Sequence, residues 1–137
     1  MSRTLKVTYD LKIEPEDIPF EGNCSAVDPE TDKQQEEWIR SELARGNDYA
    51  WCVVIVEASV EYEGRRYEGG SSCGGCSYRD RAELEEHMVP DLKREALADL
   101  RARLSTQIAN VNRDAEEIRK RADKARATLA RLPKRVR

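Results

Sequence analysis

The chain is poor in aromatic residues and histidine and has no long apolar run, and each shortage excludes a class of protein. Aromatic residues make up 6% of the 137 residues, while 37% are charged, so we expect a hydrophobic core smaller than the chain. The single histidine excludes any metal motif that needs two histidines. No apolar stretch reaches the roughly 18 residues of a membrane-spanning helix.

Motifs of the common enzymes are also missing from the sequence. It contains neither a GxSxG nucleophile motif nor a phosphate-binding P-loop, and most of its carboxylates fall on predicted solvent-facing positions. The first residues alternate polar and apolar side chains and lack the continuous apolar core of a signal peptide. We therefore predict a cytoplasmic protein with reduced cysteines that is not an enzyme and has no cofactor.

The charge is distributed unevenly along the chain. The formal net charge is −3, but residues 1–90 contain 10 Lys/Arg and 20 Asp/Glu, whereas residues 91–137 contain 14 Lys/Arg and 7 Asp/Glu. An acidic N-terminal part is therefore followed by a basic C-terminal part. Charge blocks of this kind indicate the type of partner that a protein attracts.

Periodicity predicts the order β-α-β-β-α. Residues 4–13 and 50–64 alternate in the manner of strands, residues 65–78 can return as a hairpin partner, and Pro and Gly make 14–27 a loop. Residues 28–46 and 80–132 are rich in helix formers, with a break expected near Pro90. The predicted fold is α+β, with a three-stranded antiparallel sheet, helices on one face and a long C-terminal helix that extends as a coiled coil. Residues 1–104 would form the α+β domain and 105–137 a basic helical extension.

The long C-terminal helix carries a heptad seam. From Asp91 to Leu132 the sequence has neither glycine nor proline, and apolar residues recur with the 3.5-residue period of a coiled coil. A strand of about 10 residues can cover only about 22 helical residues, so the sheet would bury the helix no further than Leu104. We therefore predict a homodimer through this helix. The seam consists of Leu104, Ile108, Val111, Ala115, Ile118, Ala122, Ala125, Leu129 and Leu132.

The orientation of such a dimer stays open at the level of the sequence. A parallel pair would place two strongly basic ends side by side, and an antiparallel pair would set each of them against the less basic start of the other helix. A solvated single helix is the alternative to any pair.

The segment GGSSCGGCSY, residues 69–78, contains a CxxC spacing at Cys73 and Cys76. Structural zinc usually needs four ligands, and the two remaining cysteines lie in a loop and in a hydrophobic strand. A redox motif would need a cysteine at a helix N-terminus, where Asp80 is the better cap. We therefore predict no metal site, and we interpret the small residues as allowing a bulge and close approach of the long helix.

Acidic residues gather on the first predicted helix, and they form a candidate surface for a basic partner protein. They are Asp28, Glu30, Asp32, Glu36, Glu37 and Glu42. The basic tail could hold phosphates by charge alone. It lacks the interleaved aromatic residues that stack on bases, and the chain as a whole is acidic, so nucleic acid is not the preferred partner.

Four stretches of the sequence resemble a group of small proteins encoded by phages and prophages. They are IEPEDIPFEGN…AVD, AWCVVIVEA, GGCSYRD and DLKREALADL, and the resemblance covers residues 4–104. It implies no activity and no catalytic residue. Its genomic setting suggests an accessory protein of the host cytoplasm that acts by binding, such as an acidic-surface inhibitor of a host defence protein. The alternatives are a nucleic-acid-associated protein that uses the basic helix and a small cysteine-based metal or redox module.

Overall fold

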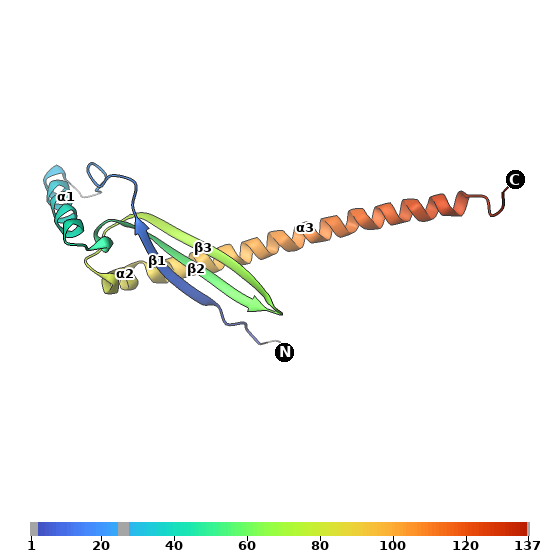
Figure 1. The fold of residues 1–137 in the computed structure, drawn as a ribbon, viewed down its shortest axis with the longest axis horizontal. Coiled ribbons are helices and arrows are strands. Elements are labelled where there is room, and N and C mark those ends of the chain that lie inside the picture. The colour runs from blue at the N-terminus through green and yellow to red at the C-terminus, as the bar shows by residue number, and fades with distance from the viewer. Residues whose placement is uncertain (1–2, 25–27, 137) are drawn as a thin grey trace. The chain divides into compact units, whose positions relative to one another are not determined.

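The computed structural model describes residues 3–24 and 28–136 and divides the chain into two compact units (Figure 1). The first unit ends at Arg101 and the second begins at Ala102. Residues 25–27 of the predicted 14–27 loop lie outside the described residues.

The order of elements is the predicted β-α-β-β-α, with a short 3-10 turn and a break before the last helix. Asp80 caps α2 by accepting from the backbone N–H of Glu83, and Pro90 is the second residue of α3, where its missing N–H costs no helical hydrogen bond. The break predicted near Pro90 is thus confirmed. The elements are β1 (Thr8–Pro15), α1 (Pro29–Ala44), η1 (Asp48–Ala50), β2 (Cys52–Tyr62), β3 (Arg65–Cys76), α2 (Arg81–His87) and α3 (Val89–Arg131).

The three strands form one antiparallel sheet in the order β1-β2-β3. Val56, at the centre, stands opposite Leu11 of β1 and Ser71 of β3. The prediction started the first strand at residue 4, but β1 begins at Thr8, and Leu5 is nearly half exposed. Alternation predicts which face a residue would take in a strand, and it does not report where pairing starts.

The core of the first unit lies between one face of the sheet and the start of α3. Side chains at every second position of β2 are buried, as the alternation in this strand predicted. Four α3 residues, at spacings of three and four, are buried as well, so one stripe of the helix faces the sheet. The two sets are Cys52, Val54, Val56, Ala58 and Val60 of β2, and Val89, Leu92, Ala96 and Leu100 of α3.

The prediction that small residues let the helix approach the sheet is confirmed at Gly69. A Cβ atom on Gly69 would lie 2.3 Å from the backbone nitrogen of Leu100 and 2.6 Å from its Cα. Gly69 stands opposite Ala58, which is fully buried, and Ala96 is fully buried on the helix one turn earlier. The strand and the helix therefore meet backbone to backbone.

The helix α1 and the loop after β1 lie at the end of the sheet where β1 finishes and β2 starts (Figure 1). A second cluster of side chains joins them to the sheet. Trp51 is its centre: the indole Nε1 donates to the carbonyl oxygen of Ile18 at 2.7 Å, and the ring meets Phe20 edge to face. Ile39 of α1 is fully buried. Asp28 caps α1 by accepting from the backbone nitrogen of Thr31, as the sequence predicted.

Candidate interaction surfaces

The second unit contains the predicted seam, and most of the large apolar side chains on it are exposed. Because the described part of this unit is helical to Arg131 and has no β-strand, those side chains have little of their own unit to pack against. Ala122 and Leu104 are half-buried, whereas Ala115 and Ala125 are exposed. The large exposed members are Ile108, Val111, Ile118, Leu129 and Leu132, with exposed fractions between 57% and 69%.

The polar side chains of this unit stabilise the helix locally. Arg119 lies 3.5 Å from Glu116, and Arg126 lies 3.0 Å from Asp123, each pair three residues apart along the helix. Pairs of this kind contribute about 0.2–0.5 kcal/mol each to an isolated helix. They support helix formation, but they do not remove the apolar seam from water.

The six acidic residues of the candidate partner surface do not all serve the same purpose. Asp28 is the cap of α1, and hydrogen bonds from Thr31 lower the pKa of its carboxyl. Glu36 accepts from the backbone nitrogen of Gly22 at 2.8 Å, and Glu42 pairs with Arg45 at 2.8 Å. These three carboxylates hold the fold of α1 and its neighbouring loops.

Two other members of the acidic set, Glu30 and Glu37, are exposed. They lie seven residues apart, which places them on the same face of α1. No hydrogen bond or ion pair of their carboxylates with another described residue is found, so these two charges are the ones open to a partner. Asp32, the sixth residue, is half-buried, and its charge helps to raise the pKa of the Cys24 thiol.

Two buried cysteines, Cys52 and Cys76, lie at the open end of the β2–β3 hairpin, and their surroundings do not favour nucleophilic chemistry. Cys52 stands opposite Cys76 in the β2–β3 pairing, and the register shifts between Cys52 and Val54, which is the predicted bulge. Burial raises the pKa of the Cys52 thiol to about 11 and that of the Cys76 thiol to about 12. Reactive cysteines have a lowered pKa and access to solvent.

The part of the chain that the structure describes contains no group of side chains arranged to bind a metal ion. No three or more histidine, cysteine, aspartate or glutamate side chains come together there in a way that could hold an ion. Cys24 lies in the loop before α1, away in sequence from the hairpin, and its thiol is within 3.6 Å of the carbonyl oxygen of Phe20.

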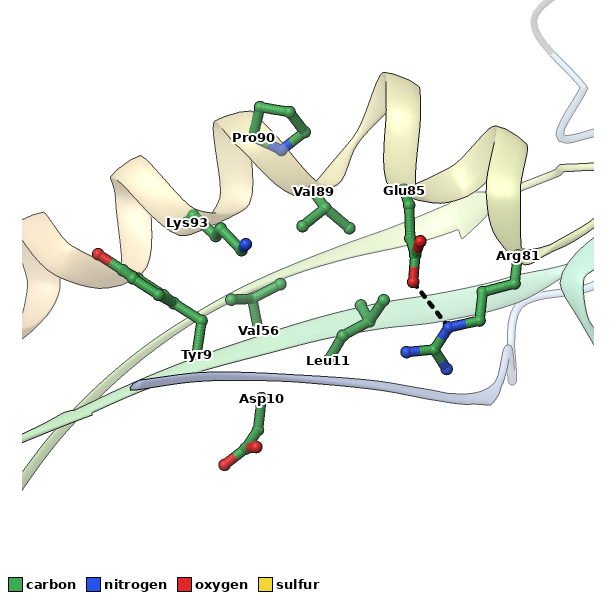
Figure 2. A pocket seen from close by; sticks show the side chains of 9 residues that line it. All are labelled: Tyr9, Asp10, Leu11, Val56, Arg81, Glu85, Val89, Pro90 and Lys93. Atoms are coloured by element: carbon green, nitrogen blue, oxygen red, sulfur yellow. Dashed lines mark hydrogen bonds and ion pairs between the residues drawn. The ribbon is translucent and has the colours of Figure 1, made fainter. Parts of the chain in front are cut away.

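A groove of about 650 Å³ opens between β1 and the helices α2 and α3 (Figure 2). Its apolar part comes from Leu11, Val56 and Val89. The charged groups are paired: Arg81 bonds Glu85 at 2.7 Å, and the Lys93 ammonium lies 5.4 Å from the centre of the Tyr9 ring. Asp10 points to the other side of the strand (Figure 2). The groove therefore combines an apolar lining with charged side chains.

Sequence reasoning missed a carboxylate that joins the loop after β1 to the end of β3. Glu16 accepts hydrogen bonds from the backbone nitrogen of Gly75 at 2.6 Å and from that of Ile18 at 3.2 Å. These bonds lower the pKa of the Glu16 carboxyl. Gly75 has a φ of 64°, in the region that favours glycine. No local pattern could reveal this contact, because the two partners are 59 residues apart.

Comparison of the chain with protein-family models, with curated proteins and with solved structures gives no match. Among the described residues, no helix combines the length and the apolar character needed to cross a membrane. Function is therefore inferred from the surfaces of the chain itself.

Proposed function

We propose that this chain is a non-enzymatic binding protein that pairs with a second copy of itself through the seam of α3. The observation that carries the proposal is the exposure of five large apolar side chains on one stripe, four of them on α3 and the fifth, Leu132, directly after its last residue. Single exposed apolar residues are common on protein surfaces, whereas a continuous apolar stripe marks an interaction site. The heptad period of the stripe fits another helix of the same kind.

The energy available from the seam is sufficient for a dimer. Burying a large aliphatic side chain completely is worth roughly 1.5–3 kcal/mol, and more than half of each of the five side chains is exposed. Ten such side chains in a pair would contribute about 9–18 kcal/mol. Association costs about 4–15 kcal/mol in lost freedom of motion, and the net gain of about 8 kcal/mol that a micromolar dimer needs lies within the range that these two figures allow.

The acidic first unit supplies the second part of the proposal, a surface for a basic partner protein. Glu30 and Glu37 are its open charges, and the excess of acidic residues before residue 91 extends the attraction beyond them. Pairing through the second unit would give each assembly two such surfaces. Two linked sites bind a repeated or dimeric target more tightly than one site does. An inhibitor of a defence protein, as the resemblance to phage proteins suggests, is one form that this function can take.

Light scattering during size-exclusion chromatography tests the pairing. We expect the wild-type chain to be a dimer at micromolar concentration, and Val111→Asp/Ile118→Asp to be a monomer with a folded first unit. The matched control is Ala109→Asp/Asn110→Asp, which adds the same charge to the same helix outside the seam and should stay dimeric. A monomeric wild-type chain at high micromolar concentration, or a dimeric seam variant, would contradict the proposal.

A further inference from the structure

The order of large and small residues along the seam specifies how the two helices pair. In a parallel pair each seam residue faces its own copy, so Ala115, Ala122 and Ala125 would each meet another alanine. Three of the nine layers would then lack the side-chain volume that a packed interface needs. In an antiparallel pair each seam residue faces a different seam residue of the other helix, so small residues can face large ones.

We infer that the two copies pair antiparallel, in the one register that sets Ala102 of each chain opposite Arg131 of the other. This inference rests on the proposed self-association and adds its orientation and register. Ala102 begins the second unit and Arg131 ends α3, so this register uses the whole helical part of that unit. Its layers are Ile108 with Ala125, Ala115 with Ile118, Ala122 with Val111, and Leu104 with Leu129 of the second copy.

Every alanine of the seam thereby meets a large aliphatic side chain, and no alanine meets another alanine. The single layer with two large residues, Leu104 with Leu129, lies at each end of the pair. Shifting the antiparallel register by one heptad in one direction places Ala115 against Ala125. The order of large and small residues thus excludes this shift, and the length of the helix favours the proposed register.

The charges beside the seam favour this register as well. Along one flank of the seam, Asp114 of each copy lies next to Arg121 of the other, which gives two attractive pairs. Along the other flank, Arg119 lies next to the uncharged Asn112. The heptad shift just described would set Arg121 against Arg121 and Arg119 against Arg119. The shift in the other direction would set Asp114 against Asp114. Like charges beside a seam select against the wrong alignment.

A parallel pair would be penalised by the basic end of the helix. It would place Arg121 of each copy beside Arg126 of the other, and it would align the two strongly basic ends. In the antiparallel register residues 118–131, with six Lys/Arg and one Asp, lie opposite residues 102–115, with two Arg and one Asp. The repulsion between the two basic segments is therefore smaller.

Two charge reversals separate the two orientations in opposite directions. In the antiparallel register Arg121→Glu faces Asp114 and should raise the dimer dissociation constant about tenfold at low salt. In a parallel pair the same variant would face Arg126 and would tighten the dimer. Arg119→Glu is the matched control. In the antiparallel register it faces Asn112, and we expect the dimer dissociation constant to change by no more than about twofold. In a parallel pair it would face Asp114 and would weaken the dimer.

The control also accounts for effects on the helix itself. Arg119→Glu removes the ion pair with Glu116, so a loss of affinity caused by a weaker helix should be at least as large for this variant as for Arg121→Glu. The double variant Asp114→Arg/Arg121→Glu exchanges the charges and should restore the affinity. Sedimentation equilibrium at 50 mM NaCl measures all four proteins.

Cross-linking gives a second measurement that does not depend on charge. In the proposed register two copies of residue 108 are separated by 17 residues of helix, about 25 Å along the axis, and a disulfide requires Cα atoms within about 7 Å. Ile108→Cys alone should form no 108–108 disulfide, whereas its mixture with Ala125→Cys should form a 108–125 disulfide on oxidation. Peptide mass spectrometry distinguishes these products from those of the native cysteines, and the oxidised wild-type chain is the reference.

The outcomes separate this inference from the proposed function. A monomeric wild-type chain contradicts both. A dimer that Arg121→Glu tightens, or that forms 108–108 disulfides from Ile108→Cys alone, contradicts the antiparallel inference and leaves self-association in place. A dimer that responds equally to Arg119→Glu and Arg121→Glu contradicts the register.

Discussion

Replacing Gly69 by alanine tests the most constrained contact of the first unit. The added Cβ would lie 2.3 Å from the Leu100 nitrogen and 2.6 Å from its Cα, whereas carbon atoms in ordinary contact are about 3.5–4 Å apart. Both neighbouring atoms belong to the backbone of a helix, so no side-chain rotation can relieve the clash. The strand and the helix would have to separate by about 1 Å.

That separation would loosen more than one contact. Two hydrogen bonds join β3 to α3 beside Gly69: the Gly70 nitrogen donates to Asp99 at 2.8 Å, and the Ser71 hydroxyl donates to Glu95 at 2.5 Å. Overpacking of this kind costs about 1–3 kcal/mol, and the reduced freedom of the unfolded chain returns about 0.4–1 kcal/mol. With the strained hydrogen bonds added, we expect Gly69→Ala to lower the free energy of unfolding by about 2 kcal/mol.

Gly70→Ala is the matched control for the Gly69 substitution. It makes the same chemical change in the next residue of β3, where the nearest atom to the added Cβ is the Val56 carbonyl oxygen at 3.6 Å. That distance is an ordinary contact, so the free energy of unfolding should change by less than about 0.5 kcal/mol.

Tryptophan fluorescence during urea and thermal unfolding can measure the difference, because both tryptophans, Trp38 and Trp51, belong to the first unit. A loss of 2 kcal/mol should lower the melting temperature by about 8–16 °C for a unit of this size. If Gly69→Ala were as stable as the wild-type chain, or if both variants lost the same free energy, the close approach of strand and helix would not be what requires glycine at this position.

Two further predictions concern the thiols and the acidic surface. Because the pKa values of the Cys52 and Cys76 thiols are raised to about 11 and 12, the free energy of unfolding should be constant below pH 9 and fall above it, by about 1.4 kcal/mol per pH unit for each thiol that ionises only in the unfolded chain. Urea unfolding with a reductant at pH 8 and pH 10 measures this fall. The fall should be smaller for Cys76→Ala, and an equal fall would show that burial of this thiol is not the cause. Glu37→Lys should weaken salt-sensitive binding of poly-L-lysine with an unchanged melting temperature, whereas Glu36→Lys, at the next residue, should cost about 1 kcal/mol of stability through its lost bond to Gly22. Equal melting temperatures for the two variants would contradict this division of roles.

The sequence predicts those parts of the fold that depend on local periodicity and capping. Alternation along β2, the caps at Asp28 and Asp80 and the break at Pro90 all act within a few residues, and each of them is found in the structure. The small residues around Gly69 also point correctly to close packing against the long helix.

Contacts between distant segments could not be predicted in this way. Glu16 bonds to Gly75 across 59 residues, and no spacing within either segment indicates that they meet. The acidic helix shows the same limit, because composition cannot separate Glu36, which holds the loop at Gly22, from Glu37, which is open to solvent. A carboxylate's role depends on which backbone N–H groups the fold brings within reach of it.

The composition of the second unit is difficult to explain unless it has a helical partner. If this helix acted only as a basic arm, lysine, glutamate or glutamine at the seam positions would form an equally stable helix and would keep five large aliphatic side chains out of water. Large aliphatic side chains stabilise an isolated helix little, because most helical stability in proteins comes from packing an apolar face against a partner. A non-specific hydrophobic contact between the seam and another surface would not require alanine at three particular positions. These three positions are the ones where an antiparallel copy presents isoleucine or valine. From Leu104 to Leu129, both the large and the small residues of the seam are accounted for when the second copy supplies the opposite face.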